Sequence, residues 1–229
     1  MYTIFTDFSY IDELIENGVE YAVIDVDNTI AQSSATDLGL TIKKEQISNK
    51  ILWLLWVCLF AIQIPFFYLI DFFNRDFLLK VVMKKYHSFS LSKIEKSAEE
   101  LFEKKLKKQF IMFTHDLIFH LKKKGVKVVL LSHNIEPLIK KYAKYFDVPY
   151  VCLSVKPNGN RCEVDLSNLA DFKLREIQKY DPSKTIAIGD SKHDFPVLNY
   201  VKYPIVVCHK KEKWIDKLQN EPLIIPINK

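Results

Sequence analysis

The sequence is poor in glycine and cysteine, and it has no low-complexity linker or internal repeat. Only 5 of its 229 residues are glycine, and 27% are charged, so neither a fibrous repeat nor a disordered chain is indicated. The four cysteines have no C-x-x-C spacing: Cys58, Cys152, Cys162 and Cys208. Cys58, Cys152 and Cys208 have apolar neighbours, which predicts core thiols in a reducing compartment.

The N-terminal stretch MYTIFTDFSYIDELIENG lacks the features of a secretion signal. It has no basic segment and no continuous apolar segment, and instead predicts an amphipathic helix that is capped at Ser9, with Asp12 three residues on, and ends at Gly18. We therefore expect a cytoplasmic protein.

The net charge of +5 is concentrated in one segment. Residues 75–108 hold ten Lys and Arg against five Asp and Glu, an excess equal to that of the whole chain. This segment follows an apolar run, a combination that suits either an anionic membrane surface or a solvated helix face. No interleaved pattern of arginine and aromatic residues is present, so we expect no nucleic-acid partner.

The rest of the chain alternates short apolar runs with helical patterns. YAVIDV, VKVVLLS, YVCLSV, KTIAIG and PIVVC have the length and β-branched content of buried strands, and EPLIKKYAKYF, LADFKLREIQKY and DFPVLNYV have helical spacing. This alternation predicts an α/β fold: a Rossmann-like three-layer core with a mostly parallel sheet. Asn158-Gly159 predicts a small hairpin.

A helical insertion separates the first two predicted strands. We expect residues 1–30 and 111–229 to form the core and residues 31–110 to form an all-helical cap. One cap helix is predicted to begin at Ser92 and to bury Ala98, Leu101, Phe102 and Leu106 on one face.

Polar residues follow the predicted strands. Asp25 and Asp27 end the first strand in VIDVDNTI, where period-2 geometry directs both side chains the same way at the edge that holds ligands in such sheets. LLSHN places Ser132 after the second strand, and IAIGDSKHD places Asp190 and Asp194 after the fourth. Lys173 stands on a helix between them. Each signal is weak alone, because a strand followed by a polar turn is common.

Together, in this order, the four motifs resemble those of the haloacid dehalogenase superfamily of phosphohydrolases: D-x-D-x-T, a Ser or Thr at a strand end, a Lys, and G-D-x-x-x-D. The resemblance covers Tyr21 to about His209, apart from the insertion. It implies that Asp25 is the nucleophile and Asp27 the general acid and base. It further implies that Ser132 and Lys173 bind phosphate, and that Mg²⁺ is held by an acidic set: Asp25, Asp27, Asp190 and Asp194. We expect Asn134 to bind phosphate as well.

The chemistry of phosphate monoesters agrees with these roles. Their uncatalysed hydrolysis is so slow that accelerations of up to ~10²¹-fold are needed. A carboxylate approaches a phosphate dianion only if a cation, a lysine and backbone N–H groups offset the repulsion. Attack by Asp25 gives an aspartyl-phosphate, which divides one difficult displacement into two steps.

Three positions leave alternatives open. The family commonly has glycine where this chain has Asn28, although asparagine also tolerates unusual backbone angles. Lys156, Lys179 and Lys184 compete with Lys173, which fits best because it stands at a helix start. His133 and His193 flank motif residues and are candidates for lining the pocket.

The apolar run ILWLLWVCLFAIQIPFFYLI at 51–70 is long enough to cross a bilayer. A single crossing between Asp25 and Asp190 would separate the two halves of one site, so we expect the run to bend at Pro65 instead. The resulting hairpin, within 51–73, would dip into one leaflet between basic residues and give a peripheral or monotopic protein at the inner face of the membrane. The alternative is a hairpin buried in the cap or in a dimer interface.

An apolar cap and a DSK-x-D form of the last motif resemble the phosphatidylglycerophosphatase C-like branch, which is close to the phosphoserine phosphatases. The resemblance implies a Mg²⁺-dependent phosphatase for a lipid phosphate such as phosphatidylglycerophosphate. Two alternatives are a soluble phosphatase for a small metabolite such as phosphoserine and a non-catalytic membrane-bound scaffold. A phosphotransferase is a further alternative, since an acceptor other than water can take the phosphoryl group.

Overall fold

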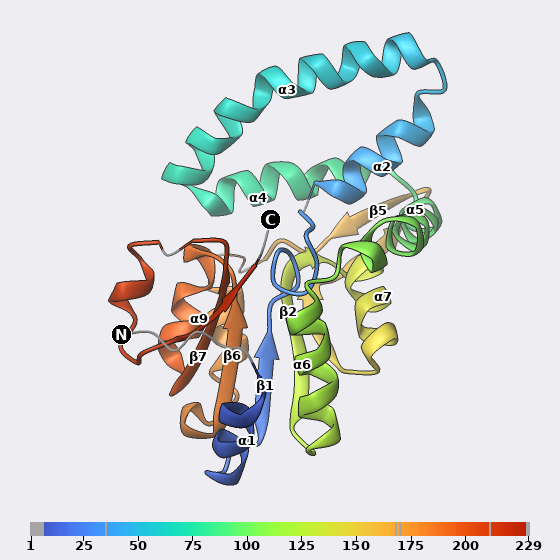
Figure 1. Ribbon diagram of the computed structural model, residues 1–229. Helices are drawn as coiled ribbons and strands as arrows, with labels where there is room; N and C mark the ends of the chain where they lie inside the picture. The colour runs from blue at the N-terminus through green and yellow to red at the C-terminus, as the bar shows by residue number, and fades with distance from the viewer. Residues whose placement is uncertain (1–6, 35, 168, 170, 211, 228–229) are drawn as a thin grey trace.

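The computed structural model describes residues 7–34, 36–167, 169, 171–210 and 212–227, which contain a six-stranded parallel sheet (Figure 1). The strand order is β3-β2-β1-β6-β7-β8, and every neighbouring pair is parallel. The strands are Tyr21–Ile24 (β1), Lys127–Ile135 (β2), Tyr150–Leu153 (β3), Thr185–Gly189 (β6), Tyr203–Cys208 (β7) and Leu223–Pro226 (β8). The predicted α/β fold is confirmed, and β8 extends the sheet beyond the five predicted strands.

Helices cover both faces of this sheet. Their bounds are Ser9–Glu16 (α1), Met112–Lys123 (α6), Glu136–Phe146 (α7), Phe172–Ile177 (α8) and Phe195–Tyr200 (α9). Successive side chains of β1 point to opposite faces, so Ala22 and Ile24 join the buried cluster with α1, α6 and α7, whereas Val23 joins the cluster with α8 and α9. The result is the expected three-layer core.

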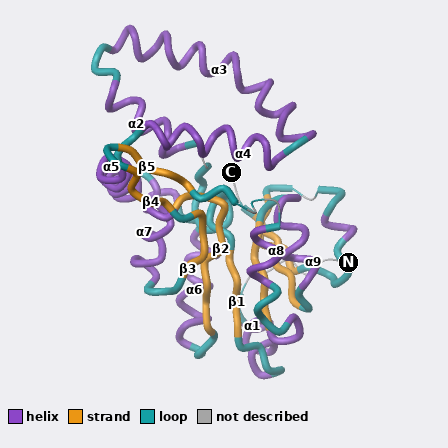
Figure 2. Tube along the Cα trace, turned by 180° about the vertical axis from the view of Figure 1, so that it is seen from behind, coloured by secondary structure: helices purple, strands orange, loops and turns teal. Residues whose placement is uncertain are grey.

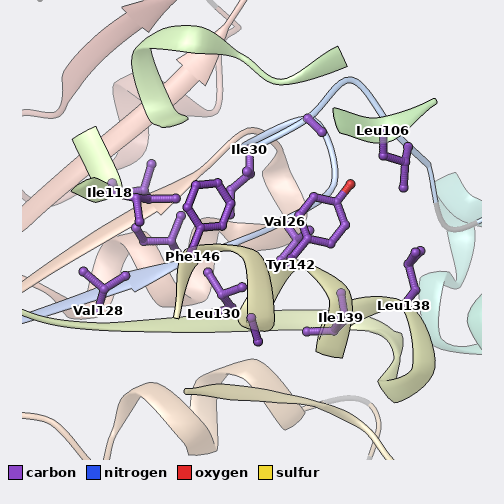
Figure 3. Packing of buried hydrophobic residues seen from close by; sticks show 14 of the residues in the cluster. Val26, Ile30, Leu106, Ile118, Val128, Leu130, Leu138, Ile139, Tyr142 and Phe146 are labelled. Atoms are coloured by element: carbon purple, nitrogen blue, oxygen red, sulfur yellow. The ribbon is translucent and has the colours of Figure 1, made fainter. Parts of the chain in front are cut away.

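The larger buried cluster fixes α6 and α7 against the sheet (Figure 3). Tyr142 and Phe146 of α7 are almost fully buried and lie near Val128 and Leu130 of β2. Burial of apolar surface on this scale is the main favourable term in folding. It holds the carboxyl ends of β1, β2 and β6 together beneath the inserted helices.

The insertion between β1 and β2 forms the cap at the top of Figure 1. Its elements are Asp37–Gln46 (α2), Lys50–Phe73 (α3), Arg75–Lys84 (α4), Lys85–Ser88 (η1), Leu91–Lys104 (α5) and Leu106–Gln109 (η2). In α5 the cap residue is Ser90, whose hydroxyl accepts from the Lys93 N–H, and not the predicted Ser92. The predicted face of this helix is buried: Ala98, Leu101 and Phe102, with Leu106 just beyond its end.

Two local predictions need small corrections. The hairpin of β4 (Val155–Asn158) and β5 (Arg161–Val164) turns at residues 159–160, because Asn158 still pairs with Arg161; Gly159 takes the positive φ of 58°. At the N-terminus, Asp7 accepts from the N–H of Ser9, so Ser9 is not the cap. Gly18 takes a positive φ of 96° at the predicted helix end.

The apolar run folds as one continuous helix, α3, with Pro65 inside it, so the predicted break at Pro65 is wrong. Proline removes one hydrogen bond from a helix, and the chain instead reverses at Asn74, from which α4 runs back beneath α3 (Figure 2). Among the described helices, α3 is the only one long and apolar enough to cross a bilayer.

None of the α3 residues is buried in the protein, so the alternative of a hairpin buried within the cap does not hold. Cys58 is consequently exposed, contrary to the predicted core position, whereas Cys162 is buried beneath Tyr86, to whose carbonyl its thiol donates. A run of apolar residues predicts a segment that is shielded from water. It does not specify whether protein or another apolar phase, such as lipid, covers the segment.

Candidate active site

Asp25 and Asp27 directly follow β1, at the carboxyl edge of the sheet. The N–H of Asp25 donates to the Ile188 carbonyl of β6 (2.9 Å), which continues the strand ladder by one residue. Asn28 then adopts φ 56°, in the left-handed region that asparagine tolerates, and its N–H donates to the Ala31 carbonyl. This turn keeps both carboxylates at the carboxyl edge of the sheet.

Lys173 reaches the site from α8. Its Nζ lies 2.5 Å from Asp25 Oδ1 and 2.7 Å from Asp194 Oδ1, and all three side chains are buried. Lys179 and Lys184 pair instead with glutamates outside the site, Glu176 and Glu20. Of the four competing lysines, the structure therefore brings Lys173 to the carboxylates.

Three carboxylates converge beside this lysine. Side-chain oxygens of Asp25, Asp190 and Asp194 all lie within 4.8 Å of one another. Asp194 is held in place because its Oδ2 accepts from the N–H and hydroxyl groups of Ser191. Asp27 lies outside this group, and its predicted role as a metal ligand stays a prediction.

The pKa values show that the negative charge of this cluster is only partly neutralised. Burial raises the pKa of Asp25 to about 7, against the opposing effect of Lys173. Burial, together with the charges of Asp25 and Asp194, raises the pKa of Asp190 to about 9. For Asp194, burial is outweighed by the Lys173 charge and by hydrogen bonds, so its pKa is lowered.

A divalent cation fits this set of residues. Two buried carboxylates and the half-buried carboxylate of Asp190 converge beside one ammonium group, and the charges of Asp25 and Asp194 add to the effect of burial in raising the pKa of Asp190. Oxygen-only ligands are those that Mg²⁺ prefers. Asp25, Asp190 and Asp194 are therefore the residues that could hold it.

Asp27 occupies a separate hydrogen-bonded position. Its Oδ1 accepts from the Ser33 hydroxyl (2.7 Å), and its Oδ2 accepts from Nδ2 of Asn134 (3.1 Å). The Asn134 N–H in turn donates to the Ser132 hydroxyl (3.0 Å). Burial raises the pKa of Asp27. The arrangement can hold a carboxyl group that takes up and releases a proton.

Two hydroxyl groups of the site were not predicted. Thr29 is the threonine of the D-x-D-x-T motif, and its Oγ1 donates to Asp25 Oδ2 (3.3 Å). Ser33 lies in the loop that follows the motif, and no periodic or spacing signal in the sequence predicts its bond to Asp27.

The two histidines face the boundary between core and cap. Burial lowers the pKa of His133 to about 3, so its ring is neutral at pH 7. Its Nε2 is buried without a hydrogen-bond partner among the described residues. His193 Nε2 lies 3.3 Å from Asp71 Oδ2 in the last turn of α3. The charges of Lys173 and Asp194 act on His133, whereas His193 contacts the cap, and neither ring belongs to the group of possible metal ligands.

Comparison with protein families agrees with this geometry. The sequence profile of the haloacid dehalogenase-like hydrolases matches residues 22–199, which include all four motifs. No curated protein matches the chain by sequence.

Solved structures share the fold at low sequence identity. A protein of unknown function from Bordetella pertussis Tohama I is 10% identical, with a TM-score of 0.66, over 90% of this chain and 98% of that one. A phosphoserine phosphohydrolase-like protein from Francisella tularensis subsp. tularensis SCHU S4 is 19% identical, with a TM-score of 0.62, over 89% and 94%. A phospho-aspartyl intermediate analogue of phosphoserine phosphatase is 14% identical, with a TM-score of 0.61, over 91% and 93%.

Proposed function

The chain belongs to the haloacid dehalogenase-like hydrolases, and from that premise we propose that it is a Mg²⁺-dependent phosphomonoester hydrolase of a membrane lipid phosphate. The observation that carries the reaction is the buried contact of Asp25 with Lys173, beside Asp190 and Asp194. The observation that carries the lipid is the exposed apolar helix α3 of the cap, whose last turn contacts the loop that carries Asp190 and Asp194 through Asp71 and His193.

In the first step, an Asp25 carboxylate oxygen attacks phosphorus, and the bond from phosphorus to the leaving oxygen breaks. Asp27 donates its proton to that oxygen, so the products are an aspartyl-phosphate and an alcohol. Lys173 favours the ionised form of Asp25 against the effect of burial and, with Ser132 and Asn134, binds phosphate oxygens. Mg²⁺, when bound by the three carboxylates, offsets the charge repulsion between Asp25 and the phosphate dianion.

In the second step, Asp27 acts as the base. It takes a proton from water, whose oxygen attacks the phosphorus of the aspartyl-phosphate and releases inorganic phosphate and the Asp25 carboxylate. Ser33 and Asn134 orient Asp27 through both of its oxygens. Burial favours its protonated form, which the first step requires.

The surface of α3 supports the proposal of a lipid substrate. Its outer face is defined here by the apolar side chains that are each more than half exposed: Ile51, Leu52, Leu54, Leu55, Leu59, Ile62, Phe66, Tyr68, Leu69, Phe72 and Phe73. An exposed apolar patch of this extent marks an interaction with a protein or a membrane. Basic residues adjoin it in the sequence, Lys43, Lys44 and Lys50 before and Lys80, Lys84 and Lys85 after, as an anionic lipid surface would favour.

The test measures Mg²⁺-dependent phosphate release from phosphatidylglycerophosphate in mixed micelles and from phosphoserine in solution. We expect release from the lipid to be faster. Asp25→Asn is the matched blank, because asparagine has the same shape and no nucleophilic carboxylate; its rate should fall on the order of 10⁴-fold or more, with the fold intact by circular dichroism. Full activity of Asp25→Asn would remove the proposed mechanism.

Phosphoserine is the second candidate substrate because the chain shares its fold with phosphoserine phosphatases. Faster phosphate release from phosphoserine would favour a soluble substrate. The exposed apolar face of α3 would then be explained by contact with another protein. The same assay therefore decides between the two substrates.

A further inference from the structure

A groove separates α3 from the rest of the cap. It has a volume of about 380 Å³, within the range of small-molecule sites. Its walls come from α2, α3, α4 and η1, with residues from the ends of these elements. None of these residues belongs to the carboxylate cluster or to the residues around Asp27.

The α3 wall of the groove is aromatic. Trp56, Phe60 and Phe67 are only half-buried, and they lie on the inner face of the helix, opposite its outer face. Their rings form a row with Trp53, at centroid distances of 5.4 Å for Trp53–Trp56, 5.3 Å for Trp56–Phe60 and 6.0 Å for Phe60–Phe67. The facing wall adds Leu40 and Val82. These surfaces suit a hydrocarbon chain.

The charged residues that line the groove are all positive. Lys43, Lys84 and Lys85 line it, and no lining residue among the described ones is acidic. Lys85 Nζ lies 5.4 Å from the centroid of the Phe67 ring, so a cation and an apolar wall adjoin each other. A ligand that complements both has an anionic group beside a hydrocarbon chain, and an anionic phospholipid has this structure.

A short stretch of sequence separates the groove from a residue that bonds to Asp27. Thr36, at one end, is three residues beyond Ser33, whose hydroxyl bonds to Asp27. Tyr86 lies at the base of the groove, where its hydroxyl approaches Gly39, and the charge of Asp27 contributes to raising its pKa. A molecule in the groove therefore lies on the cap side of Asp27.

We propose that the groove between α2, α3 and α4 binds one acyl chain of an anionic phospholipid, whose phosphodiester group pairs with Lys43, Lys84 and Lys85, so that the phosphomonoester of a substrate is left for Asp25. The outer face of α3 contacts the bilayer, and its inner face holds the single chain drawn from it. This inference rests on the proposed function, because it makes the groove the site for the hydrocarbon part of the lipid substrate.

Quenching of tryptophan fluorescence by lipids with brominated acyl chains tests the groove. The probe is phosphatidylglycerol vesicles, which carry an anionic phosphate and no phosphomonoester. One variant keeps Trp56 as the only tryptophan (Trp53→Phe, Trp214→Phe). A second variant reports from the outer face: Tyr68→Trp with all three native tryptophans changed to phenylalanine. Both variants also carry Asp25→Asn, so that turnover plays no part.

We expect bromine to quench both reporters. Gly39→Leu, which fills the groove from α2, should remove most of the quenching of Trp56 and leave that of the outer reporter; Val82→Phe is a second filling variant. Leu55→Phe on the outer face is the matched control, and it should change the quenching of neither Trp56 nor the outer reporter. Changing the three lysines to glutamine should weaken binding to phosphatidylglycerol vesicles and not to phosphatidylcholine vesicles.

Quenching of the outer reporter alone would overturn the groove proposal and leave α3 as a membrane contact. If neither reporter is quenched, both the groove proposal and the membrane contact of α3 are overturned. If Trp56 stays unquenched while the native chain releases phosphate from phosphatidylglycerophosphate, only the groove fails. If Trp56 is quenched while the native chain releases no phosphate, only the proposed function fails.

Discussion

Gly189 ends β6. The residues that follow it, 190–194, form the acidic loop, which turns back on the strand and carries Asp190 and Asp194. A Cβ atom built on Gly189 would lie 2.7 Å from the Asp194 Cβ and 2.9 Å from its Cγ, closer than real Cβ atoms approach. The absence of a side chain at this position therefore lets Asp194 reach Lys173. This is a steric requirement, because Gly189 has no positive φ.

We predict that Gly189→Ala displaces Asp194, lowers the free energy of unfolding by roughly 1–3 kcal/mol as overpacking does, and weakens Mg²⁺ binding. Gly39→Ala is the matched control, since its Cβ would meet only the Tyr86 hydroxyl at an ordinary 3.6 Å. In α2 that change should be neutral or should stabilise by up to ~1 kcal/mol. Urea denaturation measures both, and equal stability of the two variants would contradict the steric account.

Between elements, the corner of α3 and α4 ties the cap to the acidic loop. Asp71, in the last turn of α3, accepts from Arg75 Nη1 (2.7 Å) and lies 3.3 Å from His193. Lys192 places its ammonium group 5.4 Å from the Phe72 ring of the same turn. His193 and Lys192 both lie within the loop that carries Asp190 and Asp194, so the end of α3 contacts the candidate metal site through that loop.

We predict that Asp71→Asn raises the Mg²⁺ concentration needed for half-maximal phosphate release severalfold, because His193 loses its charged partner and the loop is held less firmly. The free energy of unfolding should change by ~1 kcal/mol or less, as for other partly exposed ion pairs. Asp71 is a positioning residue in this account. Asp76→Asn, in the first turn of α4, is the control, and the same Mg²⁺ requirement in both variants would rule the account out.

In the molecule as a whole, the carboxylate cluster couples stability to pH and to Mg²⁺. The pKa values of Asp25 and Asp190 are about 7 and about 9 in the fold, above the ordinary value of 3.8 for an unfolded chain. Between pH 4 and these values the folded state binds more protons than the unfolded state. The contribution of these two groups to stability therefore falls as pH rises through this range.

We predict that Mg²⁺ raises the melting temperature more at pH 8 than at pH 5.5, because the cation competes with protons for Asp25 and Asp190. For one such ligand, the apparent Kd should weaken about tenfold for each pH unit below its pKa. Thermal melts with and without Mg²⁺ at the two pH values measure this. Asp190→Asn should reduce the difference, and an equal Mg²⁺ effect at both pH values would contradict the prediction.

Much of this molecule was predictable because local signals agree with it. Five apolar runs predict five of the six strands, and EPLIKKYAKYF coincides with α7. Asn28 was expected to tolerate an unusual backbone angle and adopts a left-handed one. The errors are at places where equivalent local choices compete, such as Ser90 and Ser92 as caps, or Asn158-Gly159 and Gly159-Asn160 as turns.

The sequence by itself determined five of the six strands, the position of the insertion and the aspartates at the strand ends, because short-range periodicity and the order of motifs carry that information. Only the tertiary structure decided which of four lysines meets Asp25, that Ser33 and Asn134 bond to Asp27, and that α3 continues as one helix through Pro65 with its apolar side chains uncovered. Contacts across 148 residues, as between Asp25 and Lys173, depend on how helices and strands pack. Hydrophobicity along a chain does not specify whether protein or lipid will cover it.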